Sequence, residues 1–395
     1  MRYAALPDRL AGLGGAKWAI HARARALAAA GREVIELTIG EPDVPTPARL
    51  IEVAHAAMRA GRTGYSSGSG ERGLREVLAA RYSARSGRMI SPEQAVCFPG
   101  TQTTLYAVLM ALVGPGCEVL VGDPMYATYE GLIAATGART VPVPLSPQHG
   151  FRLQAADLAA RIKPQSRVIL LNTPHNPTGA VLRRDDIQAI GRLACQHDLW
   201  IVADEVYADL IYDGTEFASA LSEPDLAERV IVASSISKSH AAPGFRSGWC
   251  IGSEVFCARL LPLAETMLFG NQPFIADMTA AALQAVSPVA AGMRQRFAAR
   301  AERLHARLDG VNGLRVHRPE AGMFALVEIT ATGQQSDAFA ADLLEATGVA
   351  VMPGLSFGPG LRDWVRVSLT ASDAALEQAA TRIAAHVWHL QRNAA

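Results

Sequence analysis

The sequence predicts an α/β fold with two domains: a large domain built on a mostly parallel sheet flanked by helices, and a smaller α+β domain. Three observations predict this fold. The chain has 395 residues, which exceeds the size at which a single hydrophobic core stops growing. Half of its residues are hydrophobic, which is enough for a large core. Between residues 118 and 251, predicted strands alternate with helices at the spacing of βαβ units, without a long linker.

The charge balance and the cysteines limit the class of function and the location. Lys and Arg total 37, as do Asp and Glu, so the net charge is near zero. Binding to nucleic acid or to acidic membranes is not expected, because both require a basic excess. The five cysteines form no CxxC pair and favour free intracellular thiols. No signal-peptide pattern and no apolar run of roughly 20 residues is present, so we expect a cytoplasmic protein without a membrane partner.

The first predicted elements lead into a rigid loop. Residues 1–15 predict a short arm, residues 16–30 a helix stopped by a glycine, and residues 34–39 a short strand. Gly40 then opens the sequence Gly-Glu-Pro-Asp-Val-Pro-Thr-Pro, whose prolines favour one loop shape. Such a loop can cross a binding site or form a hinge between domains.

A helix is predicted over residues 48–60, and a second begins at about Gly73. The Gly/Ser-rich loop between them carries Tyr65 and is either a linker or a segment that faces a partner subunit. Farther along, Gly100 and three threonines stand at the start of a helix predicted over residues 105–113. A helix start of this composition offers N–H groups and hydroxyls to a phosphate, although it is also a common N-cap.

Polar residues follow each of the next predicted strands. Tyr126 follows the strand at 118–121, and its ring could stack on a planar ligand or pack against a helix start. Asn176 follows the strand at 167–171 in Asn-Thr-Pro-His-Asn-Pro-Thr-Gly, whose prolines would hold its amide rigidly. In open α/β sheets, ligands bind at these carboxyl ends of the strands.

Asp204 continues the apolar strand predicted at 199–203, so we expect a buried carboxylate. Such a group needs a partner, which a cationic ligand nitrogen or a structural salt bridge would supply. Tyr207 could reach the same ligand.

Lys238 follows another apolar run, residues 229–233, in the segment Ser-Ser-Ile-Ser-Lys-Ser-His. Ser235, Ser237 and Arg246 surround it in the sequence, which suits an amine that forms a Schiff base beside a bound phosphate. Desolvation and neighbouring cations lower the pKa of an ammonium group and make the amine nucleophilic. A solvated loop lysine is the simpler alternative for this position considered alone.

The remaining sequence predicts the smaller domain. It contains helix-rich sequence followed by further strands, at residues 254–309 (with a loop at 269–273), 322–329 (strand), 336–347 (helix), 349–352 (strand) and 364–368 (strand). The predicted domain organisation is an N-terminal arm with part of the small domain, a large ligand-binding domain and a small C-terminal domain, over residues 1–45, 46–285 and 286–395.

Together and in this order, the motifs resemble the class I and II pyridoxal-phosphate (PLP) aminotransferases of fold type I. The resemblance covers nearly the whole chain and rests on GEPDVPTP, YSSGSGERGLRE, PGTQTT, DPMYATY, NTPHNPTG, DEVY, SISKSHAAPGFRSG and WVRVSL. It implies pyridoxal 5′-phosphate as the cofactor, an amino acid and a 2-oxo acid as substrates, and a homodimer with shared active sites. It implies no metal.

The resemblance implies a role for each matching residue. Lys238 would form the Schiff base with PLP and carry the proton between Cα and the cofactor. Asp204 would pair with the pyridine nitrogen, Tyr207 and Asn176 would bind the phenolic oxygen, and Tyr126 would stack on the ring. The phosphate would be held by Gly100, Thr101, Gln102, Ser235, Ser237 and Arg246.

Three further roles follow from the same resemblance. Tyr65 would reach the phosphate of the neighbouring subunit's cofactor. Arg366 would bind the α-carboxylate of the substrate through two parallel hydrogen bonds, and Gly40 and Asn176 would line the same site. The expected reaction is transamination with ping-pong kinetics.

The choice of amino donor rests on a narrower resemblance. Several segments resemble bacterial arginine–pyruvate transaminases, among them MRY, Trp18-Ala19-Ile20-His21 and DPMYATYE. We therefore expect arginine as donor and pyruvate as acceptor, with aspartate, alanine or aromatic donors as alternatives. Residues 266–275 contain no arginine, which weakens the aspartate alternative. A PLP-dependent β-lyase or decarboxylase on the same fold also remains open, whereas the sensor domain of a transcriptional regulator is not favoured, since little sequence precedes the first strand.

Overall fold

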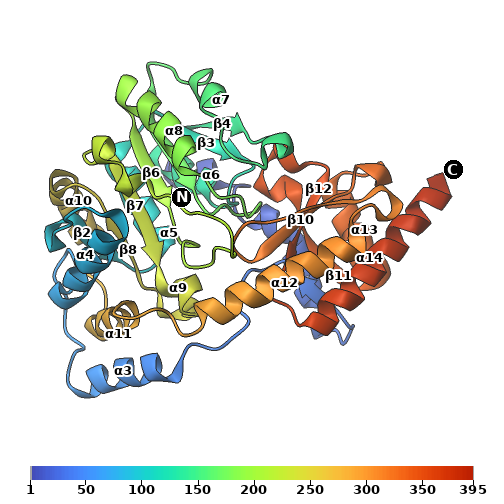
Figure 1. The fold of residues 1–395 in the computed structure, drawn as a ribbon, viewed down its shortest axis with the longest axis horizontal. Coiled ribbons are helices and arrows are strands. Elements are labelled where there is room, and N and C mark those ends of the chain that lie inside the picture. The colour runs from blue at the N-terminus through green and yellow to red at the C-terminus, as the bar shows by residue number, and fades with distance from the viewer. Residues whose placement is uncertain (1, 395) are drawn as a thin grey trace.

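Two sheets organise the chain, as seen in a computed structural model that describes residues 2–394 (Figure 1). The larger sheet has seven strands, and β8 alone among them runs antiparallel to its neighbours. In spatial order these strands are β2 (Ala95–Phe98), β8 (Gly248–Ile251), β7 (Val230–Ser235), β6 (Trp200–Asp204), β5 (Ser166–Asn172), β3 (Glu118–Asp123) and β4 (Arg139–Pro144). The predicted mostly parallel sheet is therefore confirmed.

Helices cover both faces of this sheet, because its strands are apolar on both sides. Ile201 and Ala203 of β6 join the core on one face, while Val202 between them joins the core on the other. The first face is covered by α3 (Ala48–Arg59), α4 (Arg72–Ser86), α7 (Ala155–Ala159), α8 (Arg184–Gln196) and α11 (Pro273–Leu283). The second face is covered by α5 (Thr101–Leu112), α6 (Tyr129–Thr136) and α10 (Glu254–Met267).

The smaller sheet has five strands and a separate hydrophobic core. In spatial order the strands are β1 (Ile35–Leu37), β11 (Val349–Pro353), β12 (Trp364–Ser368), β10 (Phe324–Glu328) and β9 (Arg315–His317). The helices of this part are α2 (Ala19–Ala29), α12 (Ala290–Leu308), α13 (Ser336–Thr347) and α14 (Asp373–Ala394). The early strand β1 pairs with the late strand β11. The domain boundaries at 45/46 and 285/286 stay a prediction.

Several elements differ from the sequence-based expectation. The helix predicted over 105–113 begins four residues earlier, at Thr101, because Gly100 at φ +87° ends the preceding extended segment. The edge strand β4 was not predicted; its sequence Arg-Thr-Val-Pro-Val-Pro carries two prolines, which are tolerated only at an edge. The three-residue strand β9 and the helices α6 and α14 were also not predicted.

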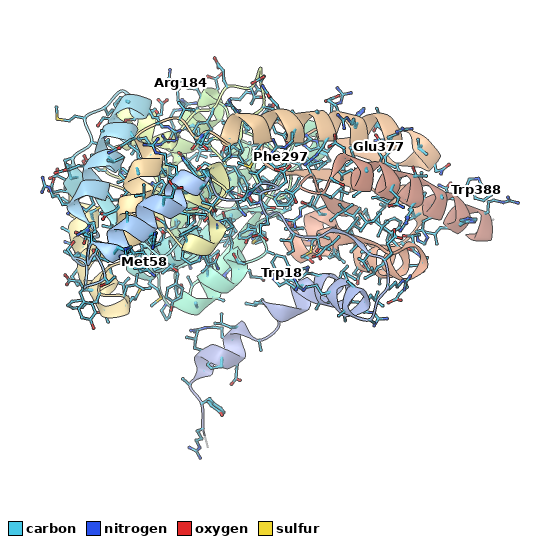
Figure 2. The ribbon with its side chains drawn as sticks, turned by 90° about the horizontal axis from the view of Figure 1, so that it is seen from below. Trp18, Met58, Arg184, Phe297, Glu377 and Trp388 are labelled. Atoms are coloured by element: carbon cyan, nitrogen blue, oxygen red, sulfur yellow. The ribbon has the colours of Figure 1, made fainter. Side chains whose placement is uncertain are left out.

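Two features complete the description of the chain. Within residues 2–394, no helix combines the length and the apolar character needed to cross a membrane. The short helix α1 (Ala5–Leu10) belongs to an N-terminal arm that projects from the body of the molecule, and Trp18 lies where this arm joins the body (Figure 2).

Candidate active site

A cavity of about 300 Å³ lies at the carboxyl ends of strands of the large sheet and is closed on one side by the small sheet. Almost all of the predicted site residues line it, namely Gly40, Thr101, Gln102, Tyr126, Asn176, Asp204, Tyr207, Ser235, Ser237, Lys238, Arg246 and Arg366. Two predicted residues do not line it. Gly100 lies directly behind its wall against Arg246, and Tyr65 lies on the surface.

Lys238 lies in the one-turn helix α9 (Ile236–Ser239), directly after β7. Its Nζ atom donates a hydrogen bond to the backbone oxygen of Gly40 at 2.8 Å. Burial lowers the pKa of Lys238 to about 8, and the positive charges of Arg366 and Arg246 act in the same direction, against the carboxylates of Glu41 and Asp204. A fraction of this amine is therefore unprotonated near neutral pH.

Asp204 ends β6 and is 5% exposed. The Tyr129 hydroxyl donates to its Oδ2 atom at 2.7 Å, and the backbone N–H of Val206 donates to Oδ1 at 3.1 Å. Burial raises the pKa of Asp204 to about 6, although both hydrogen bonds and the charge of Lys238 favour the carboxylate. In the described part of the chain Asp204 forms no salt bridge, so the carboxylate is left for a cationic group in the cavity.

Arg366 reaches the cavity from β12 of the small sheet and is 2% exposed. Its Nη1 atom donates to Oδ1 of Asn176 at 3.0 Å, and its guanidinium lies 3.9 Å from the ring centre of Phe324. Its Nε atom is buried and has no hydrogen-bond partner among residues 2–394. Burial lowers the pKa of Arg366 to about 10, which still leaves it charged at neutral pH. A buried guanidinium without a carboxylate partner is suited to bind an anion.

Asparagines connect these charged groups. The side chain of Asn172 accepts a hydrogen bond from the backbone N–H of Asn176 at 2.8 Å and donates to the backbone oxygen of Asp204 at 3.2 Å. Asn176 in turn holds Arg366. Tyr207 is buried beside Asn176, and burial raises the pKa of its phenol, so this hydroxyl stays protonated and can donate.

A polar corner lies at the start of α5. Gly100 adopts φ +87°, and a Cβ atom at this position would collide with the guanidinium of Arg246. The hydroxyl of Thr101 is buried without a partner among the described residues. Ser235 caps α9 by accepting a hydrogen bond from the N–H of Ser237 at 3.3 Å. Free N–H groups at the start of α5, hydroxyls and one guanidinium make this corner suitable for a phosphate.

Tyr126 and Tyr65 differ in their surroundings. Tyr126 lines the cavity and meets the ring of Tyr129 edge to face at a centroid distance of 5.5 Å. Tyr65 is 90% exposed and outside the cavity, where its ring meets that of Phe269 edge to face at 5.6 Å. Within one chain, Tyr65 contributes nothing to the site.

The sequence analysis missed eight residues that line the cavity, and four of them have polar or aromatic side chains: Trp18, Tyr129, Asn172 and Phe324. Tyr129 and Asn172 belong to the motifs DPMYATY and NTPHNPTG, so the motifs contained a signal that could have identified them. Trp18 precedes all strands of the large sheet in the sequence, and Phe324 follows all of them. No local pattern marks either residue.

The chain is similar to known proteins over nearly its whole length. The family model described as "Aminotransferase class I and II" matches residues 32–383. The chain is 43% identical to arginine–pyruvate transaminase AruH of Pseudomonas aeruginosa, over 97% of this chain and 98% of that protein. It is 32% identical to an aspartate/prephenate aminotransferase of Cereibacter sphaeroides, over 93% and 94% of the two chains. Its structure is similar to that of an aspartate aminotransferase double mutant of Thermus thermophilus, with a TM-score of 0.91 and 30% identity over 98% of this chain and all of that one.

Proposed function

This chain belongs to the class I and II aminotransferases and is an enzyme of that family, and we propose that it moves an amino group from L-arginine to pyruvate in a ping-pong reaction that uses pyridoxal 5′-phosphate. One observation carries the proposal. A buried amine with a lowered pKa, Lys238, shares a cavity with a buried carboxylate, Asp204, and a buried guanidinium, Arg366, and the two charged groups form no salt bridge among the described residues.

The residues present fit the cofactor. PLP carries a phosphate, a pyridine nitrogen and an aldehyde, and the cavity offers a complementary group for each. At the start of α5 the Thr101 hydroxyl is buried without a partner among the described residues, and a Cβ atom at position 100 would overlap the guanidinium of Arg246 as it lies here. Asp204 would hold the charged ring nitrogen, and Lys238 would hold the aldehyde carbon.

When bound, PLP supplies an electron sink that stabilises the negative charge left on Cα after its proton is removed. The chain's own residues bind, orient and move the proton. Arg366 would bind the substrate α-carboxylate, which places Cα within reach of the Lys238 amine. Lys238 would then take the Cα proton at Nζ and deliver it to the cofactor. Tyr207 would donate a hydrogen bond from its hydroxyl, since burial keeps it protonated.

The proposal of arginine as donor rests on sequence similarity to a relative and on the lack of an arginine that could bind a second substrate carboxylate. The relative named as an arginine–pyruvate transaminase shares 43% of its residues with this chain. Aspartate is the second candidate donor, because other relatives are named as aspartate aminotransferases. The segment from 266 to 275 offers no arginine for a second carboxylate, which favours the first candidate.

The assembly and the location are also part of the proposal. A homodimer would cover the exposed aromatic pair of Tyr65 and Phe269, which are 90% and 61% exposed. A reducing compartment such as the cytoplasm suits the five cysteines, all of which are free.

The first test is chemical. Protein purified with excess PLP is treated with borohydride, digested and examined by mass spectrometry. We expect a pyridoxyl group on Lys238, and its absence there would overturn the proposed cofactor chemistry. Amino donors are then compared with pyruvate as acceptor, and alanine formation is followed. A rate with arginine no higher than that with aspartate or with aromatic donors would overturn the choice of donor.

A further inference from the structure

The amine of Lys238 is held by a loop that is distant from it in the sequence. Nζ of Lys238 donates a hydrogen bond at 2.8 Å to the backbone oxygen of Gly40, in the loop that follows β1. The backbone of Gly40 packs directly on the ring of Phe324, with which a Cβ atom at position 40 would collide. Because a glycine has no Cβ atom, its carbonyl can lie this close to the amine. The direction of the amine therefore depends on where this loop lies.

The loop, residues 40–46, contacts the segment around Lys238 at both of its ends. At its far end the hydroxyl of Thr46 donates a hydrogen bond to the backbone oxygen of Ala241, three residues after the lysine. Between the two ends, Asp43 makes every side-chain hydrogen bond and ion pair that residues 40–45 form with the rest of the described chain. The middle of the loop therefore depends on one carboxylate for its polar contacts.

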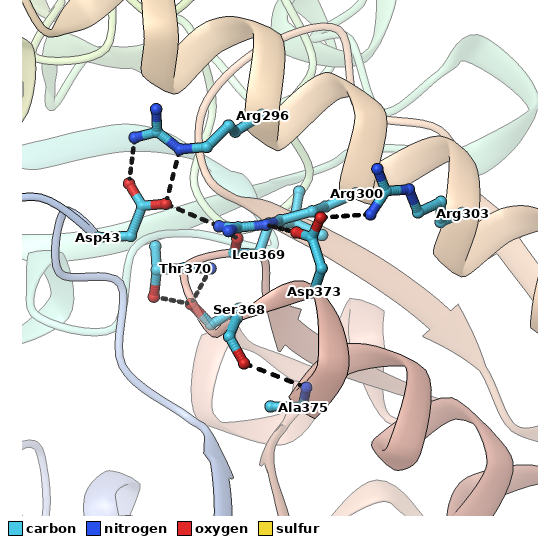
Figure 3. A network of polar contacts seen from close by, with 10 residues as sticks. Asp43, Arg296, Arg300, Arg303, Ser368, Leu369, Thr370, Asp373 and Ala375 are labelled. Carbon is cyan, nitrogen blue, oxygen red and sulfur yellow. Dashed lines mark hydrogen bonds and ion pairs between the residues drawn. The ribbon is translucent and has the colours of Figure 1, made fainter.

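Asp43 lies between two arginines of α12 (Figure 3). It accepts hydrogen bonds from Arg296 at 2.8 and 3.0 Å and from Arg300 at 2.8 Å, and its side chain is 9% exposed. Burial raises the pKa of the Asp43 carboxyl, but the hydrogen bonds and charges of the two arginines hold this pKa below its usual range. The group is thus a carboxylate at neutral pH, and ion pairs that are partly buried are screened less by salt than exposed ones.

Helix α12 also contacts the lysine segment directly. The buried hydroxyl of Ser287, three residues before this helix begins, donates a hydrogen bond at 2.5 Å to the backbone oxygen of Ser239, which follows Lys238. It accepts a hydrogen bond at 3.2 Å from the backbone N–H of Ala290, the first residue of α12. One helix therefore holds both the loop that supplies the acceptor and the segment that supplies the donor of the hydrogen bond on the amine.

We propose that Asp43 is a positioning residue for proton transfer by Lys238: through its ion pairs with α12 it holds the carbonyl of Gly40 against the amine. Asp43 does not line the cavity, so it acts only through the loop. The carbonyl accepts one N–H of the amine and restricts the directions in which the nitrogen lone pair can point. Proton transfer requires this alignment, whereas binding of the α-carboxylate at Arg366 does not. This role rests on the proposed transamination.

Asp43→Asn tests the role, because it removes the charge and keeps the shape of the side chain. Arg300 retains the carboxylate of Asp373 at 2.7 Å and the backbone oxygen of Leu369 at 2.9 Å. Arg296 is partly exposed, so neither guanidinium is left buried without a partner. Asp373→Asn is the matched control, since it removes an ion pair of Arg300 that does not involve the loop (Figure 3).

The kinetic test uses L-arginine with and without deuterium at Cα, or the amino acid that replaces arginine as the best donor, with pyruvate as acceptor. Rates are expressed per PLP-occupied site, so that unfolded protein does not count. Misplacing a catalytic group by about 1 Å can cost about a hundredfold in rate, so we expect kcat of Asp43→Asn to fall at least about tenfold while KM changes little. The isotope effect on kcat should lie well above unity and be no smaller than in the wild type, because proton transfer then limits the rate. Asp373→Asn should match the wild type in both quantities.

A structural measurement gives a readout that does not depend on turnover. In crystals of the cofactor-free variants, the Gly40 oxygen should lie beyond hydrogen-bond distance of Nζ of Lys238 in Asp43→Asn and within it in Asp373→Asn. Arg296→Gln removes one of the two arginines and should lengthen this distance less. It replaces Asp43→Asn in both tests if that variant fails to fold.

The outcomes separate the positioning role from the proposed function. If no donor yields alanine from pyruvate, the proposed function fails, and the crystal structures decide whether Asp43 places the carbonyl. If transamination proceeds but Asp43→Asn keeps the wild-type kcat per occupied site, or keeps the hydrogen bond between Gly40 and Lys238, the positioning role is overturned while the proposed function stands. A loss of kcat without an isotope effect, or an equal loss in Asp373→Asn, overturns it as well, since either would report a general structural defect.

Discussion

Lys238, Asp204 and Arg366 are charged groups that a stable fold would not bury on their own account. Burial opposes the charged form of all three, and it shifts each pKa in the direction that removes charge. Among the described residues the three groups form no salt bridge, and buried charges of this kind lower the stability of a fold. Their burial in one cavity is therefore evidence for a site in which a ligand completes the charges.

Replacing Lys238 by methionine should therefore stabilise the cofactor-free protein while abolishing activity. The pKa of Lys238 falls from 10.5 to about 8 on folding, so the folded state binds its proton less tightly than the unfolded state. The penalty is complete below pH 8 and disappears as the pH rises to 10.5. We expect Lys238→Met to gain on the order of 3 kcal/mol at pH 7 and almost nothing at pH 10.5, measured by urea denaturation. Lys163→Met, at an exposed lysine, is the control and should change little; an equal gain at both pH values for Lys238→Met would contradict this account.

Tyr129 is a positioning residue for Asp204, which it contacts through its hydroxyl at 2.7 Å. Its hydrogen bond favours the carboxylate, so removing the hydroxyl should raise the pKa of Asp204 further above its present value of about 6. The acidic limb of the kcat/KM profile should then move to higher pH. For Tyr129→Phe we expect a shift of about one pH unit, since a hydrogen bond to a charged group contributes about 1.5–3 kcal/mol. Tyr106→Phe, on the same face of the sheet, should leave the limb where it is.

At the scale of secondary structure, the start of α5 depends on close packing between backbone segments. Gly100 caps the helix at a positive φ, and Gly248 of β8 lies against it. A Cβ atom at position 248 would lie 2.7 Å from the backbone nitrogen of Thr101, which is closer than real Cβ contacts allow. The two glycines therefore determine where α5 begins and where its free N–H groups lie.

Gly248→Ala should displace the start of α5 and weaken binding of PLP. We expect the dissociation constant for PLP to rise at least about tenfold, as over-packing of a tight contact costs about 1–3 kcal/mol. Titration of cofactor-free protein by fluorescence measures this. Gly244→Ala is the matched control, because a Cβ atom at Gly244 would meet open space. Equal PLP affinities for the two variants would show that the close contact at Gly248 does not matter.

At the scale of the whole molecule, the site is assembled from both sheets. Asp204 ends a strand of the large sheet and Lys238 lies in the helix that follows another, whereas Arg366 belongs to the small sheet. The loop after β1 contacts Lys238 through the backbone oxygen of Gly40. The ion pairs of Asp43 with Arg296 and Arg300 of α12 hold this loop against the layer of the small sheet (Figure 3). Any shift between the layers would change the distance from Arg366 to Lys238, so the two layers together define the site.

A shared active site in a homodimer can be tested by complementation. Lys238→Ala and Tyr65→Ala should each be nearly inactive alone if Tyr65 serves the neighbouring subunit. Mixed subunits should regain about a quarter of the wild-type rate, because half of the dimers would be mixed and one site in each would be intact. Light scattering would establish the dimer. If mixed dimers regained no activity, Tyr65 would not serve the neighbouring subunit.

The sequence alone determined the architecture and most of the cavity. Buried parallel strands are continuous apolar runs, and each such run here ends in polar residues that face the same edge of the sheet. Asn176, Asp204 and Lys238 could therefore be expected together without any coordinates. Prolines and glycines specified the loops after the strands, because these residues restrict or extend the backbone regardless of their distant surroundings.

Only the tertiary structure decided which distant segments complete the site. Trp18 and Phe324 carry no local signal, because a wall of a cavity is defined by what packs opposite it and not by its own neighbours in the sequence. The hydrogen bond from Tyr129 to Asp204 and the unpartnered Nε of Arg366 depend on contacts between residues more than 70 positions apart or on their absence among the described residues. Sequence patterns report local backbone preference and burial, whereas charge complementarity inside a cavity arises only when the two sheets come together.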